Sequence, residues 1–480
     1  ALGCTFGFGA WAQQETPQRI NTNVFRQLGQ DLPTPNVYRT ASGAPGHAYW
    51  QQKADYNMKI RLDDETQRID GSETITYTNN SPDELRYVWL QLDQNVRALD
   101  SDRYKIRESS LDGRTYFSDL AGLEPEFDGG FKIQKVVDAS GKALEYTINN
   151  TMMRIDLPRP LKPGTQFKFS IDWWYNINDR MEIGGRSGYE YFEEEDNYLY
   201  TIAQFYPRMV VYSDNEGWQN KQFLGRGEFT LEFGDYELEL TVPENHTVAS
   251  TGTLANADEV LDQIQLDRLE QASASDKPIM IVTREEADSR CRRNADGTRT
   301  WKFKADNVRD FAWASSPDFA WDAMMVEIPD DEDGSMAMSY WPREGDGLWD
   351  QYSTHAVAHG VEQYSKHVFP YPWPVAISVN GPIGGGMEYP MITFNGPRPE
   401  KDGTYSERTK YGLISVIIHE VGHFWFPMMV NSDERQWTWM DEGLNTYVQF
   451  LAEREWEEDY ARDRGLPRDI TGYMASENQR

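Results

Sequence analysis

Cysteine is scarce in this chain of 480 residues, which contains only Cys4 and Cys291. Cys4 lies within Ala1 to Ala12, a segment of almost entirely apolar or small residues that ends in the A-x-A pattern Ala10-Trp11-Ala12. This pattern is typical of the tail of a secretory signal peptide, here without its basic start. Cleavage after Ala12 would leave one cysteine, which excludes an internal disulfide. We therefore expect an exported protein, periplasmic or extracellular, that has no cystine framework.

Basic residues and long apolar runs are also in short supply. The chain has 47 Lys and Arg against 78 Asp and Glu, a formal net charge of −31. Nucleic acid and anionic membranes would be repelled, so neither is expected as a partner. No segment has 18 consecutive apolar residues, so no transmembrane segment is predicted. The charge weakly favours a cationic ligand such as a peptide amino terminus, or it only keeps the surface soluble.

The length and the hydrophobic pattern indicate an α+β protein with more than one domain. Apolar residues alternate with polar ones at Phe167 to Trp173, at Phe229 to Phe233 and, after a Gly234-Asp235 turn, at Tyr236 to Val242. This period of two predicts antiparallel strands. We expect a signal-peptide remnant at 1–12, a leader at 13–48 and a β-rich domain at 49–322. One helix, roughly Asp258 to Gln271, interrupts the strands.

The second half of the chain has a helical character. Apolar residues recur at helical spacing, without strong breakers, in Trp349 to His367, Ser406 to Phe426 and Glu442 to Glu458. Pro427 follows the second of these segments and predicts its end, because proline cannot donate a backbone hydrogen bond to the preceding turn. These segments define a second, mainly helical domain over 323–480.

The chemistry is concentrated in His419-Glu420-Val421-Gly422-His423. Residues four apart on a helix share one face, so both imidazoles can ligate the same ion. Glu420 is adjacent to the first ligand and can reach a water on that ion without ligating it. Zinc lowers the pKa of such a water to about 7, and a carboxylate base then completes its activation for attack on a carbonyl. The motif predicts a metallopeptidase site that holds one Zn²⁺, with Glu420 as its catalytic base.

A third protein ligand is expected, because catalytic zinc sites normally have three. A metzincin would supply a histidine six residues after His423, but position 429 is Met. A new helix instead begins at Trp439-Met440-Asp441-Glu442-Gly443 and brings in a carboxylate. Glu442 is the predicted third ligand. Asp441 either forms a hydrogen bond with a metal ligand, on the side away from the ion, or interacts with the positive N-terminal end of its helix.

The segment from His419 to Phe450 resembles the gluzincin zinc aminopeptidases of the aminopeptidase N and leukotriene hydrolase type. Phe424-Trp425-Phe426 follows the H-E-x-x-H motif, and a W-x-x-E-G segment places Glu442 19 residues after His423. Gly385-Gly386-Met387-Glu388-Tyr389, 31 residues before His419, is similar to the exopeptidase motif G-x-M-E-N of that family. The resemblance is strong over 384–450 and loose before it.

The resemblance implies a fold, an activity and further site residues. It implies a saddle-like antiparallel β domain followed by a thermolysin-like zinc-peptidase domain, and release of the first residue from peptides with a free N-terminus. Glu388 would hold the substrate α-ammonium, which restricts cleavage to a chain end. Gly385 and Gly386 would pair their backbone with the substrate, and Gln204 would reach its amine. Tyr389 replaces the usual Asn.

The resemblance also implies missing parts. The oxyanion-stabilising tyrosine of the family lies roughly 60 residues beyond the third ligand, past Arg480, and Tyr460 and Tyr473 come too early. We therefore expect a catalytic domain that is truncated at its C-terminus.

Other interpretations remain open. The chain could be a gluzincin with endopeptidase or epoxide-hydrolase activity, or a non-catalytic relative that uses the fold as a scaffold. His355 and His359 are four apart on a helix but lack a third ligand, which favours a structural pair. Cys291 stands among arginines that could lower its pKa, although no base is evident and a plain surface loop is the favoured interpretation.

Overall fold

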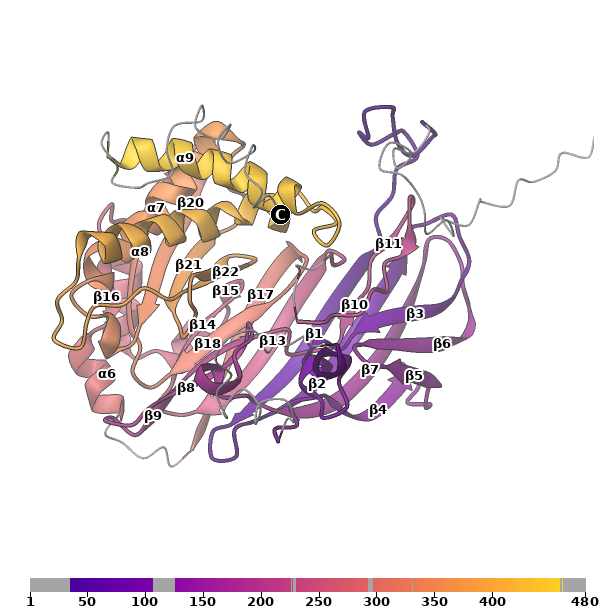
Figure 1. Cartoon of the computed structure of the whole chain (residues 1–480), viewed down its shortest axis with the longest axis horizontal. Helices are drawn as coiled ribbons and strands as arrows, with labels where there is room; N and C mark the ends of the chain where they lie inside the picture. Colours follow the sequence, from indigo (N-terminus) through magenta and orange to yellow (C-terminus); the bar gives the residue numbers. More distant parts are fainter. Residues whose placement is uncertain are drawn as a thin grey trace, which may run out of the picture.

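The computed structural model describes residues 35–106, 126–225, 227, 230–291, 297–329, 331–457 and 460, and for 331–333 it describes the backbone only. Two bodies lie side by side, a β-rich body in indigo to magenta and a body with long helices in orange to yellow (Figure 1). The predicted order, a β-rich part followed by a mainly helical part, is confirmed. The expected signal-peptide remnant at 1–12 lies outside the described residues, as does most of the leader at 13–48.

A seven-stranded sheet forms the floor of the β-rich body. Its strands are antiparallel to their neighbours, apart from a parallel pair between β1 and β13 in which Tyr56 lies opposite Tyr236. The expected alternation holds in β7, where Phe169, Ile171 and Trp173 are buried. The strand order is β15 (Thr253–Leu254), β17 (Thr298–Val308), β13 (Gly234–Pro243), β1 (Lys53–Asp63), β2 (Arg68–Asn79), β7 (Thr165–Asn176) and β4 (Lys132–Asp138).

Two four-stranded sheets pack against this floor and share its hydrophobic core. One sheet contains β10 (Arg208–Met209), β3 (Leu85–Gln91), β6 (Met152–Leu161) and β5 (Tyr146–Asn149). The other contains β14 (Thr247–Ser250), β18 (Ala312–Ser316), β9 (Asn197–Ala203) and β8 (Gly188–Phe192). A hairpin pairs β11 (Tyr212–Ser213) with β12 (Gly217–Trp218).

The short helices of this part lie in its connections. They are η2 (Asp93–Arg97), α1 (Asp102–Lys105), α3 (Arg180–Ile183), α4 (Ala257–Val260), α5 (Gln263–Ala272) and α6 (Arg284–Cys291). The helix expected at Asp258 to Gln271 is thus two helices. The break falls where Asp262 caps α5 through a capping box with Gln265.

One sequence-based detail of the strands needs correction. The Gly234-Asp235 pair, expected to be a turn, begins β13, because Gly234 already pairs with Val308 of β17. The boundary expected at 322 falls inside a strand of the sheet described next, which also recruits β16 (Ile279–Val282) from earlier in the chain. The division into domains at that residue stays a prediction.

The second body is built on a six-stranded mixed sheet. Its order is β16, β19 (Ala320–Ile328), β20 (Asp331–Trp341), β21 (Val375–Asn380), β23 (Ile392–Asn395) and β22 (Gly386–Tyr389). β22 is therefore the last strand of this sheet among the described residues. After η3 (Arg343–Gly345), α7 (Trp349–His367) covers the sheet, and its bounds are those predicted from the sequence. None of the described helices is long and apolar enough to span a bilayer.

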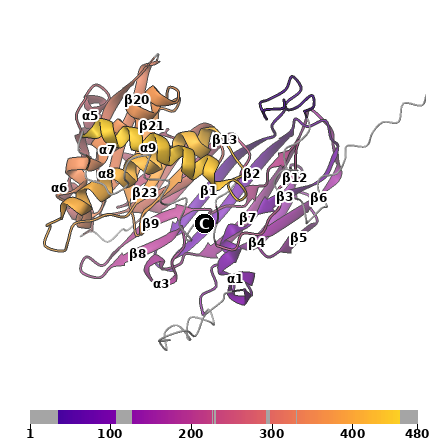
Figure 2. The same ribbon diagram turned by 45° about the horizontal axis from the view of Figure 1, so that its top comes forward.

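Two further helices complete this body. α8 (Glu407–Gly422) packs beside α7, and α9 (Leu444–Trp456) crosses both of them, as the two views show (Figure 1, Figure 2). Wide turns occupy the connection between α8 and α9, namely η4 (Phe424–Met429) and η5 (Trp439–Gly443). The helix expected to run to Phe426 thus ends at Gly422, and Pro427 lies inside η4.

Candidate metal centre

The C-terminal end of α8 carries the H-E-x-x-H motif. Ser406 begins the helix, since its hydroxyl accepts a hydrogen bond of 3.1 Å from the amide of Thr409. The opposite face of the helix is buried through Leu413, Ile417 and Val421, among others, and this burial fixes its rotation. His419 and His423 consequently point the same way, with their Nε2 atoms 3.1 Å apart.

Glu442 completes a group of three metal-binding side chains. Its Oε2 lies 3.3 Å from Nε2 of His419 and 3.7 Å from Nε2 of His423. Three donors bound to one tetrahedral zinc at about 2.0–2.1 Å lie about 3.3 Å from one another. The three side chains therefore fit a zinc ion with little rearrangement. His423 also belongs, with Glu388 and Asp441, to a second set of potential ligands among the described residues.

The far nitrogen of each imidazole is held by a hydrogen-bond acceptor. Nδ1 of His419 lies 2.9 Å from Oε1 of Gln449. Nδ1 of His423 lies 2.7 Å from the carbonyl oxygen of Phe426 and 2.8 Å from the fully buried carboxylate of Asp441. Acceptors at Nδ1 place the proton there and leave Nε2 free for an ion.

Negative charge surrounds the ligands. Burial lowers the pKa of His423, but the nearby carboxylates of Glu388, Asp441 and Glu420 outweigh it and raise this pKa well above its usual range. The hydrogen bond from His419 outweighs the partial burial of Glu442 and, helped by the charges of His423 and Arg186, lowers the pKa of this carboxyl to about 2. The group thus stabilises positive charge at the position where a divalent cation would lie.

Glu420 and Gly386 are in direct contact. Glu420 is 5% exposed, and a Cβ on Gly386 would overlap its carboxyl group. Only glycine at 386 therefore allows β22 to approach α8 this closely. A Cβ on Gly385 would meet no atom within 4 Å, while the carbonyl of Gly385 accepts a hydrogen bond of 2.9 Å from the amide of Gly396.

Glu388 lies on β22 and is also 5% exposed. One of its oxygens lies within 4.8 Å of ligand atoms of both His423 and Asp441. The structure thus brings five of the predicted site residues together around the motif: His419, His423, Glu442, Asp441 and Glu388. Because β22 is the last described strand of its sheet, its outer edge can accept an extended peptide.

Gln204 follows β9 with a left-handed backbone, φ 54°, and is 2% exposed. Its carbonyl accepts a bond of 3.1 Å from Gln94, whereas its buried Nε2 has no hydrogen-bond partner among the described residues. No described interaction joins Gln204 to the metal ligands. Its assignment to the substrate amine stays a prediction.

Sequence reasoning missed Gln449 and Asn445. Asn445 donates a bond of 2.8 Å to the carbonyl of His419, and Gln449 donates one of 3.0 Å to the carbonyl of Ser415. The sequence did contain a signal for both residues. Glu442, Asn445 and Gln449 are spaced by three and four residues, so on a helix they share one face.

The remaining candidates play no part in this centre. His355 is exposed, and His359 bonds the carbonyl oxygen of Ala452 at 2.8 Å, in agreement with a structural pair. Burial and the neighbouring Asp318 raise the pKa of the Cys291 thiol to about 12, so this thiol is not activated.

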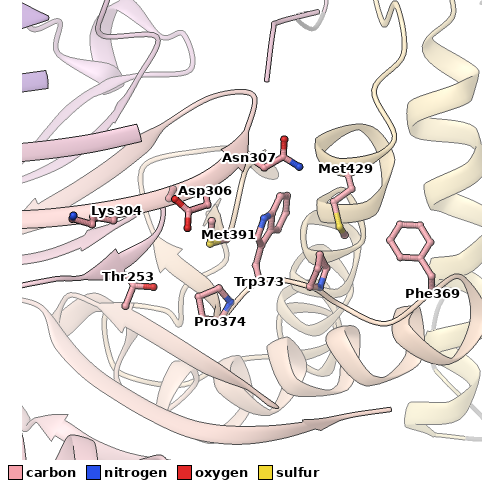
Figure 3. A pocket seen from close by; sticks show the side chains of 11 residues that line it. Thr253, Lys304, Asp306, Asn307, Phe369, Trp373, Pro374, Met391 and Met429 are labelled. Carbon is pink, nitrogen blue, oxygen red and sulfur yellow. The ribbon is translucent and has the colours of Figure 1, made fainter. Parts of the chain in front are cut away.

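A pocket of about 540 Å³ lies between the end of β17 and the loop after α7 (Figure 3). Its aromatic lining comes from Phe369 and Trp373, and its polar lining includes Lys304 and Asp306. None of the metal ligands lines it, so the pocket is separate from the centre described above.

Comparison with known proteins agrees with this geometry. Residues 352–477 match the family described as "Peptidase family M1 domain". The chain is 27% identical to aminopeptidase Ey of Gallus gallus over 137 residues and 32% identical to leucine aminopeptidase 2 of Vanderwaltozyma polyspora over 92 residues. These alignments cover 26% and 18% of this chain. The chain spans only 14% and 13% of the length of these two relatives.

Solved structures extend the likeness to the whole fold. An M1 zinc metallopeptidase from Deinococcus radiodurans matches with a TM-score of 0.50 at 14% identity, over 87% of this chain and 73% of that chain. A point mutant of it matches with a TM-score of 0.51 at 13% identity, over 88% and 74%. Residues 352–477 are therefore similar to the peptidase family M1 domain, and the fold of the described chain is similar to that of the M1 zinc metallopeptidases.

Proposed function

We propose that the protein is a zinc aminopeptidase that releases the first residue of peptides with a free N-terminus. The observation that carries this proposal is the position of Glu388. Its buried carboxylate lies on an edge strand and beside a metal ligand, within 4.8 Å of His423. A carboxylate held there can form a charge-assisted bond with the α-ammonium of a substrate. A peptide that binds through its interior residues has no such group to offer.

The remaining roles follow from position. Zinc, when bound, supplies Lewis acidity that polarises the scissile carbonyl and makes water acidic enough to lose a proton near neutral pH. Glu420 follows the first ligand on α8 and its charge acts on His423, so we assign to it the role of accepting the proton and returning it to the leaving amine. The space beside Gly385 admits the extended substrate, and Asp441 and Gln449 hold the imidazoles.

Hydrolysis of a panel of aminoacyl anilides tests this proposal. The zinc-loaded protein should release anilide, a chelator should abolish the release, and Glu420→Gln should reduce it by about 10²-fold or more. Glu388→Ala should remove activity on aminoacyl substrates. Cleavage of N-blocked peptides that survives Glu388→Ala would support an endopeptidase instead. A zinc-loaded protein that is inert towards every substrate would support a scaffold.

We further propose that the protein is exported. The support is the A-x-A pattern at Ala10 to Ala12 after an apolar segment. N-terminal sequencing of the protein recovered from the periplasm or medium should give Gln13 as the first residue. Recovery only from the cytoplasm, with the segment retained, would contradict export.

A further inference from the structure

A row of buried polar residues on α9 faces the helix that carries the two histidine ligands. Asn445, Gln449 and Glu453 are each four residues apart, so they follow one another along one side of α9. All three are buried where α9 packs against α8 (Figure 2). Polar side chains are costly to bury between two helices unless they form hydrogen bonds, so specific partners are expected for each of them.

The two ends of the Gln449 amide have different partners. Its Oε1 lies 2.9 Å from Nδ1 of His419. Its Nε2 donates two hydrogen bonds, one of 3.0 Å to the carbonyl of Ser415 and one of 2.7 Å to Oε1 of Glu453. Two acceptors on one side fix the direction of the amide, because a rotated amide would turn its oxygen towards both of them. The amide oxygen therefore faces His419, and the imidazole keeps its proton on Nδ1.

Glu453 places a buried carboxylate at the end of this row. Its side chain accepts hydrogen bonds from Nε2 of Gln449 and from the hydroxyl of Ser415, which belongs to α8. Hydrogen bonds to a carboxylate are charge-assisted and roughly twice as strong as those between neutral groups. The carboxylate thus has a defined position relative to His419, from which it is separated by a single amide group.

The amide of Gln449 connects this carboxylate to the imidazole of His419. An amide is a dipole whose negative end is its oxygen, and a carboxylate at its NH2 end polarises it further. His419 therefore has a stronger acceptor at Nδ1 than a neutral amide alone would supply, which makes Nε2 a better ligand for a cation. The second histidine ligand has a carboxylate at Nδ1 directly, because Asp441 lies 2.8 Å from that atom of His423.

We propose that Glu453 is a positioning residue of the zinc centre. It fixes the direction of the Gln449 amide and, through this amide, holds His419 with its proton on Nδ1 and with Nε2 towards the ion. The proposal goes beyond the aminopeptidase function, because it concerns the affinity for zinc and not the substrate. The alternative is that Glu453 only joins α9 to α8 through Ser415, in which case its removal would destabilise the fold without changing the imidazole.

Three variants, each checked for folding by urea unfolding, separate the two roles. Glu453→Gln keeps the size of the side chain and removes its charge, so it should raise the Kd for zinc by about 5-fold in competition with a chelator. Ser415→Ala removes only the hydrogen bond from the hydroxyl of α8 and should leave the Kd within about 2-fold of the wild type. Glu455→Gln makes the same charge change on the same helix, at a side chain that is 52% exposed, and should leave the Kd unchanged.

The Nδ1 proton of His419 supplies a readout that does not depend on activity. In the zinc-loaded protein labelled with ¹⁵N-histidine, NMR should show this proton far downfield in the wild type and in Ser415→Ala, and further upfield in Glu453→Gln. An unchanged Kd and proton position in Glu453→Gln would overturn the proposal, as would equal changes in Ser415→Ala.

The wild type alone also tests the proposal, even if Glu453→Gln does not fold. A wild-type spectrum in which the Nδ1 proton of His419 is not shifted downfield would overturn it. The expected Kd values and spectra in a protein that hydrolyses no peptide would support the role of Glu453 and overturn only the proposed function.

Discussion

The carboxyl group of Glu420 lies against the Cα of Gly386, in the space that any larger residue at 386 would need. This contact joins α8, which carries the proposed catalytic base, to β22, which carries the carboxylate proposed to bind the substrate amine. The distance between Glu420 and Glu388 thus depends on the absence of a side chain at position 386. Gly385, one residue earlier, has open space on the corresponding side of its backbone.

Gly386→Ala should therefore impair catalysis without removing zinc. The added methyl group must displace either Glu420 or the strand, and a misplacement of about 1 Å can cost about 10²-fold in rate. We expect kcat to fall by about that factor while zinc content stays at one ion per chain. Gly412→Ala, on the same helix as Glu420 and with no atom within 4 Å of the added methyl group, is the control and should change kcat less than about 3-fold. Equal losses in the two variants would contradict this account of the contact.

Gln449 should determine metal affinity. Its Oε1 holds Nδ1 of His419 at 2.9 Å, and loss of such a partner typically weakens metal binding by 10–100-fold. We expect Gln449→Leu to raise the Kd for zinc by about that factor in competition with a chelator. Gln271→Leu, at an exposed position on α5, is the control. An unchanged Kd in Gln449→Leu would show that the hydrogen bond does not hold the ligand.

A buried ion pair fixes the loop between the second and third ligands to the β-rich body. Nη1 of Arg309 lies 2.5 Å from the carboxylate of Glu434, and the two side chains are 3% and 1% exposed. Removal of one partner leaves a buried charge, so Arg309→Met should cost about 3–5 kcal/mol of unfolding free energy. The double variant Arg309→Met with Glu434→Met should recover part of that loss in urea unfolding.

A surface pair supplies the control for this experiment. Lys59 and Glu239 lie 3.3 Å apart with side chains that are 66% and 47% exposed. Lys59→Met should therefore change the unfolding free energy by less than about 1 kcal/mol. If Arg309→Met cost no more than Lys59→Met, the buried pair would not be what holds the loop.

Asp322 should make stability depend on pH. It is 2% exposed, and burial raises the pKa of its carboxyl to about 7, although Thr354 donates a hydrogen bond to it. The unfolded chain loses this proton at about pH 4, so between pH 4 and 7 the folded state binds more protons. The contribution of Asp322 to stability is thus full below pH 4 and is lost as the pH rises to 7.

Asp322→Asn removes this titration. Relative to the wild type, the variant should gain about 2–4 kcal/mol of unfolding free energy between pH 5 and pH 8, measured in urea at fixed zinc concentration. Asp258→Asn, at an exposed carboxylate of α4, should show no such gain. If the unfolding free energies of the wild type and of Asp322→Asn differ by the same amount at both pH values, the pKa of Asp322 is not raised.

Much of the fold followed from local pattern. The helix over Trp349 to His367 has the predicted bounds. The alternation of apolar and polar residues over 167–173 predicted the strand β7. Local pattern did not predict strands whose bounds depend on pairing with residues far away in the sequence. Gly234 begins a strand because β13 pairs with β17 and β1. β16 pairs with β19, which begins at Ala320, 41 residues after Ile279, and no local pattern indicates this pairing.

The same limit applies to the site. The pair of His419 and His423 was readable because helical geometry relates residues that are close in sequence, and Glu442 was predicted because a catalytic zinc site needs a third ligand. The contact between Arg186 and Met387 joins residues that are 201 positions apart, and only the packing of the two bodies brings them together. Contacts of this kind cannot be predicted from local sequence pattern.

The central claim is that Glu388 and the zinc site together restrict cleavage to the first residue of a free chain. The most direct test gives the zinc-loaded protein one peptide with a free amino terminus and the same peptide acetylated, and follows the products by mass spectrometry. We predict stepwise loss of N-terminal residues from the free peptide only. Equal cleavage of the acetylated peptide, or cuts inside either peptide, would contradict the claim.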